Sequence, residues 1–142
     1  MGHALADEVL RICAEISEFE RNPDVSFHSE RVGLSPRRAR GPRQIVEAEI
    51  NTVVIGDAIA LATFPGGFFV EHGLSLKSRS KFRHTFFVGY CNGGLGYFPK
   101  INACVEGGYG ADSITPRLEP GSGEHFVNRA LVNLCRQSGK LR

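Results

Sequence analysis

The fold is decided by two runs, Ala58-Ile-Ala-Leu-Ala-Thr-Phe-Pro-Gly-Gly67 and Thr85-Phe-Phe-Val-Gly-Tyr-Cys-Asn-Gly-Gly-Leu-Gly-Tyr97. Each begins with a short apolar stretch, which predicts a buried strand, and continues into a glycine-rich loop. The residues between them, from about Phe68 to Ser78, are predicted to form a helix. Two strands joined by one helix make a βαβ unit with parallel strands. Both loops then leave the same carboxyl edge of the sheet, which is where ligands bind in open α/β sheets.

The preceding part of the chain extends this sheet with antiparallel strands. Val25 to Val32 is predicted to be a strand exposed on one face, and Ile45 to Ile55 a longer strand with one solvated end. Gly56-Asp57 is a two-residue turn signal between apolar runs, so the second of these strands and the Ala58 strand should form an antiparallel hairpin. The predicted sheet is therefore mixed.

The two ends of the chain carry helical patterns. Apolar residues recur at intervals of three and four from Leu5 to about Glu20, which predicts an amphipathic helix. A second such pattern runs from Phe126 to Cys135 and predicts a helix that ends at Ser138-Gly139. Ser122 is placed to cap the second of them, and Glu124 favours its first turn. We therefore expect a single α/β domain over residues 1–142, with an antiparallel hairpin and one βαβ unit flanked by N- and C-terminal amphipathic helices.

The composition fits a soluble globular protein. Of the 142 residues, 42% are hydrophobic and 23% are charged, and the net charge of +2 is too small to require a nucleic-acid partner. No apolar run approaches the roughly 18 residues of a membrane span, and the N-terminus lacks the pattern of a signal peptide, so localisation stays open. The cysteines show no metal-binding spacing and are expected to be buried free thiols: Cys13, Cys91, Cys104 and Cys135.

One segment concentrates positive charge. Because it lacks interleaved aromatic residues, the cluster is more typical of a solvated loop or arm than of a phosphate-binding surface. Binding of an acidic partner is the alternative. The cluster consists of Arg31, Arg37, Arg38, Arg40 and Arg43.

The glycine-rich loops are the candidate ligand-binding segments. Gly66 and Gly67 permit a tight turn or a close approach to a ligand, although a plain strand-to-helix turn explains them equally. In the second loop Asn92 offers an amide, and Gly93 and Gly94 allow backbone conformations that other residues avoid. A direction-changing turn is the alternative there.

A third loop presents a phenol. Tyr109 lies among Gly107, Gly108 and Gly110, where it could donate to an oxyanion, ligate a metal as phenolate, or anchor the loop by packing. The histidines show neither HExxH nor HxH spacing, so no complete metal site is predicted from spacing. There is also no Gly-x-Ser-x-Gly motif, which argues against a serine hydrolase of the α/β class.

Four ordered motifs, together with the helix at Ala4 to Ile16, resemble the neutral ceramidase-like proteins of bacteria. The resemblance implies a zinc-dependent amidohydrolase that cleaves the N-acyl bond of ceramide or a similar lipid amide, with the metal activating a bound water. It covers nearly the whole chain. The motifs are Ile55 to Leu74, His84 to Pro99, Glu106-Gly-Gly-Tyr109 and Pro120-Gly-Ser-Gly-Glu-His125.

The resemblance also assigns roles to residues. The family holds zinc through two upstream histidines, the glutamate of a Pro-Gly-Glu turn and a tyrosine. Tyr109 matches the tyrosine, which makes it the candidate catalytic residue and metal ligand, but Gly67 stands where the glutamate belongs and the histidines have no counterpart. Zinc is therefore the implied cofactor, although tight binding by this chain alone is not expected.

We expect a ceramidase-like segment that is inactive by itself, whose implied partners are a lipid amide substrate and the missing N-terminal half of a larger catalytic domain. A non-catalytic ligand-binding or protein-interaction module of the same fold is the alternative.

Overall fold

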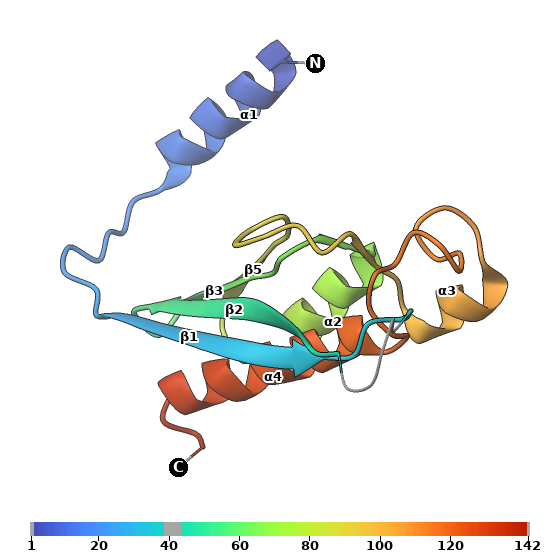
Figure 1. The fold of residues 1–142 in the computed structure, drawn as a ribbon. Coiled ribbons are helices and arrows are strands. Elements are labelled where there is room, and N and C mark those ends of the chain that lie inside the picture. Colours follow the sequence, from blue (N-terminus) through green and yellow to red (C-terminus); the bar gives the residue numbers. More distant parts are fainter. Residues whose placement is uncertain (1, 39–43, 142) are drawn as a thin grey trace.

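The computed structural model describes residues 2–38 and 44–141 (Figure 1). Four strands form the main sheet in the order β1-β2-β3-β5, and two short strands, β4 and β6, pair separately. None of the helices in the described part is long and apolar enough to cross a bilayer. The elements are α1 (Gly2–Glu15), β1 (Val25–Leu34), β2 (Val46–Ile55), β3 (Ile59–Thr63), β4 (Gly67–Phe68), α2 (Val70–Arg79), β5 (His84–Val88), β6 (Tyr97–Phe98), α3 (Ile101–Glu106) and α4 (Ser122–Gln137).

The main sheet is mixed, as the sequence predicts. Strands β1 and β2 are antiparallel, β2 and β3 form the hairpin closed by the Gly56-Asp57 turn, and β3 pairs with β5 in parallel with α2 between them. The predicted fold class, including the helices near both ends, is confirmed.

Helices α2 and α4 cover one face of the sheet (Figure 1). Helix α4 packs on β1, β2 and α2, and α2 packs on β5. The strand residues that face these helices alternate with those of the other face and include the buried apolar residues Val32, Leu34, Ala48, Ile50, Val54, Ala60 and Ala62. The core is centred on aromatic rings, with the Phe64 and Phe87 centroids 4.2 Å apart. Its fully buried members include Ile50, Ala60, Ala62, Phe64, Leu76, Phe126 and Ala130.

Polar contacts fix α4 on the sheet. The Arg129 guanidinium pairs with the Glu30 carboxylate on β1, and Asn133 Nδ2 donates to Glu30 Oε2 at 2.8 Å. Farther along, Thr52 Oγ1 donates to Gln137 Oε1 at 2.7 Å. Burial by itself raises the pKa of Glu30, but the hydrogen bonds from Arg129 and Asn133 outweigh it, so the pKa lies below its ordinary value.

Two sequence predictions about the βαβ unit are wrong in detail. The second strand, expected to be buried from Thr85 to Cys91, is the edge strand β5, which ends at Val88 and leaves Phe86 52% exposed. Helices cover only one face of this edge, so an apolar run there does not imply burial on both faces. The helix begins at Val70 rather than Phe68, because Gly67 and Phe68 pair with Tyr97 and Phe98 as β4 and β6.

The N-terminal helix also differs from its prediction. Helix α1 ends at Glu15, buries none of its residues and stands clear of the rest of the molecule (Figure 1). The expectation of buried thiols is therefore wrong: Cys13 is exposed, and the other three cysteines are partly buried. All four are free, as expected.

Two further predictions are corrected by local hydrogen bonds. Ser122 is the first residue of α4 rather than its cap; Gly121 is the N-cap, and the Ser122 hydroxyl donates to the Glu119 carbonyl at 2.7 Å. Arg37 is not part of a free arm, because its guanidinium donates to the Asp112 carbonyl at 2.9 Å. Of the same cluster, Arg40 and Arg43 lie outside the described residues.

Candidate functional site

The two glycine loops meet at the carboxyl edge of β3 and β5, as the parallel pairing requires. The Tyr90 amide donates to the Gly66 carbonyl at 3.0 Å, the Leu95 amide to the Pro65 carbonyl at 2.8 Å, and the Gly67 amide to the Gly96 carbonyl at 2.9 Å. These bonds join the loop after β3 to the loop after β5. The edge is thus one connected backbone surface.

Gly66 and Gly67 are needed for this close approach. Both are buried, and a Cβ at position 66 would stand 2.5 Å from the Gly96 carbonyl oxygen. A Cβ at position 67 would collide with the Tyr90 hydroxyl and would stand 3.3 Å from the Tyr97 ring. Neither position has room for a side chain while these neighbours stay in place.

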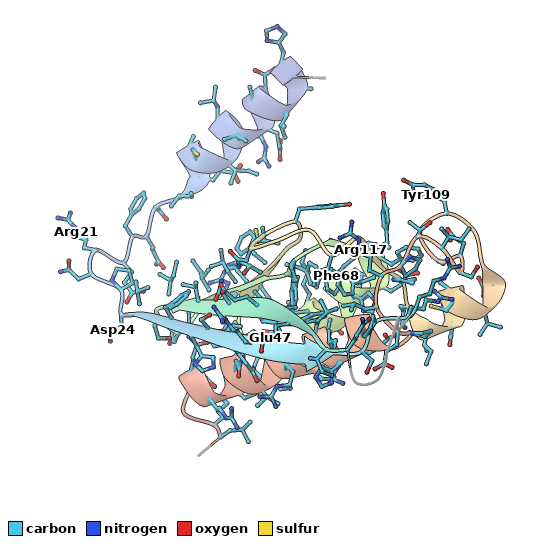
Figure 2. The ribbon with its side chains drawn as sticks, in the orientation of Figure 1. Arg21, Asp24, Glu47, Phe68, Tyr109 and Arg117 are labelled. Carbon is cyan, nitrogen blue, oxygen red and sulfur yellow. The ribbon has the colours of Figure 1, made fainter. Side chains whose placement is uncertain are left out.

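The chain's three tyrosines gather around Gly67. Tyr90 lies over it, Tyr97 pairs beside it in β6, and the hydroxyls of Tyr97 and Tyr109 are 3.1 Å apart. Figure 2 shows Tyr109 projecting from the loop after α3, and its side chain is largely exposed. The hydrogen bond with Tyr97 raises the pKa of Tyr109, so this phenol is held protonated.

Tyr90 has a backbone conformation unusual for its residue type. Its φ is +56°, in the left-handed region that costs a non-glycine residue about 1–2 kcal/mol. Asn92 has a φ of +59° in the same loop. Strained backbone of this kind clusters at functional sites, which adds Tyr90 to the candidate residues.

Asn92 and Gly93 line a shallow pocket of about 280 Å³ together with Pro65, Leu95 and residues of β1 and β2. The Asn92 side-chain amide donates to Thr63 Oγ1 at 3.0 Å, which fixes it at the end of β3. Arg31 and Glu47 form the opposite wall, 3.9 Å apart. Gly94 borders open space, since a Cβ there would meet no heavy atom within 4 Å.

The described residues contain no group of three or more histidine, cysteine or acidic side chains that could hold a metal. His72 is buried on α2, with its Nε2 against Gly123 on α4. Burial lowers its pKa, so the imidazole is neutral. His28, His84 and His125 are exposed.

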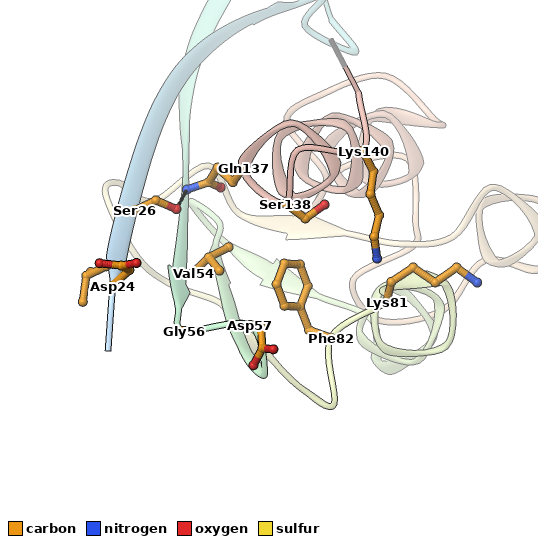
Figure 3. Close-up of a pocket in the computed structure, with 11 residues that line it drawn as sticks. Asp24, Ser26, Val54, Gly56, Asp57, Lys81, Phe82, Gln137, Ser138 and Lys140 are labelled. Carbon is orange, nitrogen blue, oxygen red and sulfur yellow. Dashed lines mark hydrogen bonds between the residues drawn. The ribbon is translucent and has the colours of Figure 1, made fainter. Parts of the chain in front are cut away.

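The larger cavity, about 600 Å³, lies at the opposite end of the sheet (Figure 3). The Phe82 ring stands at its centre, Lys81 and Lys140 lie on one side, and Asp57 lies near the β2–β3 turn. None of the candidate residues chosen from the sequence contributes to it. It is therefore separate from the edge where the glycine loops meet.

Comparison with known proteins adds one finding about the fold. No protein-family model and no curated protein sequence matches this chain. A solved structure of neutral ceramidase from Pseudomonas aeruginosa is similar to it, with 22% sequence identity and a TM-score of 0.50 over 64% of this chain. The chain shares the fold of part of neutral ceramidase. The matched region is 16% of that ceramidase chain, so most of its length has no counterpart here.

The resemblance expected from the motifs is thereby confirmed at the level of the fold. The donor set for the implied zinc does not fit, because Gly67 has no side chain and the Tyr109 phenol is hydrogen-bonded to Tyr97. The sequence analysis named Gly67, Asn92 and Tyr109 as candidates, and the structure places Tyr90 and Tyr97 beside them. The signal for these two was present, since both flank the second glycine loop.

Proposed function

We propose that this chain is a ceramidase-like segment, related to zinc-dependent amidohydrolases that act on ceramide or similar lipid amides, and that it is inactive by itself. The observation that supports this most directly is that Tyr97 links Gly67 and Tyr109. The family resemblance assigns both positions to one metal site, although they lie far apart in the sequence. Tyr97 connects them, pairing with Gly67 on one side and bonding Tyr109 on the other.

The edge would contribute one wall of a substrate cleft. In zinc-dependent amidohydrolases the metal supplies an activated water for attack on the amide carbonyl, and the residues of this chain do not fit that metal by themselves. Tyr109 would offer its phenol oxygen, which requires release from Tyr97 and loss of a proton that this hydrogen bond retains. Asn92, Gly93 and Gly94 would line the cleft, and Gly66 and Gly67 would support it from below.

Inactivity follows from the missing ligands. A catalytic zinc site has about three protein ligands and one open position. Among the described residues, only Tyr109 matches a family ligand at the proposed edge, so a partner carrying the N-terminal part of a ceramidase-like domain would have to supply the histidines. Hydrolysis by the isolated chain is therefore not expected.

The first experiment measures turnover of a fluorogenic N-acyl sphingosine by the purified chain with zinc. We expect no activity above that of zinc alone. Measurable turnover that disappears in Tyr109→Phe would contradict the proposed inactivity.

A second experiment tests the ligand assignment without relying on activity. Tyr90→Ala combined with Gly67→Glu makes room for a carboxylate at position 67, and zinc affinity is measured by calorimetry. We expect about tenfold tighter binding than in Tyr90→Ala alone, reversed by adding Tyr109→Phe. Tyr90→Ala combined with Gly94→Glu is the matched control, because position 94 is open and belongs to the same edge. Equal affinities in the two double variants would show that the assignment of Gly67 and Tyr109 to one metal site is wrong.

A further inference from the structure

The second face of the main sheet carries no helix, and the part of it near the β2–β3 turn is apolar. The strand register places Phe27, Val53, Leu61 and Phe86 side by side, one from each strand. Phe27 is 65% exposed and Phe86 52% exposed. We call this face, defined by that row and by the neighbouring Val25, Ile55 and Ile59, the open face.

Helix α1 carries an apolar stripe that is equally uncovered. Leu5, Val9, Ile12 and the following Ile16 recur at intervals of four, three and four, so they share one side of the helix. Each is between 46% and 69% exposed. One flank of the helix is charged, with Arg11 bonded to Glu8 and Glu15. An isolated helix of 14 residues is marginal in water, so α1 needs a surface to cover its stripe.

The helix is directed away from its own sheet. The connecting residues 16–24 pass the β2–β3 turn, where the Glu20 carboxylate lies so near Gly56 that a Cβ there would approach it to 2.9 Å. From that point α1 extends outward (Figure 1). A terminal helix that extends away from its own domain is free to dock on a neighbouring molecule. Reciprocal exchange of such an element is a low-cost route to a symmetric dimer.

The sizes of the two surfaces agree. A row across four strands spans about 14 Å at roughly 4.8 Å per strand, and a 14-residue helix is about 21 Å long. A fully covered phenylalanine buries roughly 150–250 Å², and Phe27 and Phe86 still expose 65% and 52% of their surface. Together with the apolar side chains of α1, one copy offers on the order of 800 Å², the share one partner contributes to a standard stable interface.

We propose that α1 of one copy docks on the open face of a second copy, and that the exchange is reciprocal. The inference goes beyond the proposed function, because it involves neither the glycine loops nor the tyrosines. It predicts that the purified chain is a dimer in which the α1 stripe and the open face are buried together. Cys13 flanks the stripe and is exposed in the single chain, so its thiol should be protected in the dimer.

The test combines light scattering over a dilution series with alkylation of Cys13. Val9→Lys on the stripe and Phe27→Lys on the open face should each raise the dimer dissociation constant by about tenfold or more and should restore Cys13 alkylation. Ala14→Lys is the matched control, because position 14 lies opposite the stripe; it should leave the dimer intact. A monomeric wild type would overturn the proposal, whether Cys13 is reactive or is protected by its own sheet. A dimer that Val9→Lys does not weaken would overturn it as well.

Discussion

Replacing Gly123 by alanine is predicted to destabilise the protein, although the residue lies in a helix. It lies in the first turn of α4, where a Cβ would stand 2.5 Å from His72 Nε2 and 2.7 Å from His72 Cε1. An ordinary contact needs about 3.5 Å or more, so the imidazole would have to move by about 1 Å. His72 is 2% exposed and packs edge-on against Phe68, with ring centroids 5.6 Å apart, so it has little freedom to move.

The expected magnitude is the difference between two terms. Overpacking a buried site costs about 1–3 kcal/mol, whereas alanine gains at most about 1 kcal/mol over glycine in a helix. With the full helix gain, Gly123→Ala should lower the free energy of unfolding by up to about 2 kcal/mol, which shifts the urea midpoint downward by up to about 1 M.

A second helical glycine provides the control. A Cβ at Gly73 in α2 would make only an ordinary contact, 3.7 Å from the Phe87 ring. Gly73→Ala should therefore stabilise the protein by up to about 1 kcal/mol. In a His72→Ala background, Gly123→Ala should lose its cost, because the colliding ring is gone. If Gly123→Ala and Gly73→Ala shift the urea midpoint in the same direction, the close packing of the His72 imidazole against α4 is wrong.

The remaining predictions concern ionisable groups. Burial lowers the pKa of His72 in the folded state, so the stability contributed by the neutral imidazole is complete above the ordinary value of 6.5 and is lost as the pH falls below it. His72→Gln should therefore reduce the change in urea midpoint between about pH 7.5 and pH 5. Glu30→Ala should cost about 1–3 kcal/mol in the same assay, since it leaves the partly buried Arg129 and the buried Asn133 without their acceptor. Removing the exposed Glu47 should change little. Hydrogen bonds from the Thr115 side chain and from the backbone lower the pKa of Asp112 to about 2, so its NMR titration midpoint should lie near 2, rising toward 3.8 in Thr115→Val.

Much of the sheet could be predicted because its signals are local. The Gly56-Asp57 turn fixes the β2–β3 hairpin, and the length of chain between β3 and β5 requires a crossover, which makes that pair parallel. The convergence of the two glycine loops follows from the parallel pairing. The burial of each strand could not be inferred in the same way, because an apolar run such as that of β5 looks alike at the centre and at the edge of a sheet.

The candidate site was predicted less completely, because its decisive features depend on backbone geometry. Nothing in the residue type of Tyr90 indicates a φ of +56°, a conformation found together with the hydrogen bond from its amide to the Gly66 carbonyl. The clustering of Tyr97 with Tyr109 likewise depends on the pairing of β4 with β6, two strands of two residues each. Strands that short leave no periodic pattern in a sequence.

Gly67 and Tyr90 are best understood as one structural unit. The Tyr90 hydroxyl occupies the space that a side chain at position 67 would enter, and the left-handed backbone of Tyr90 places it there. A carboxylate at position 67 and the present position of Tyr90 are thus mutually exclusive. Restoring a glutamate alone would force the phenol out of its position, and the cost of that displacement would offset part of any gain in metal binding. The two residues must therefore be changed together before zinc affinity can report on this edge, and Gly67→Glu by itself should bind zinc more weakly than its combination with Tyr90→Ala.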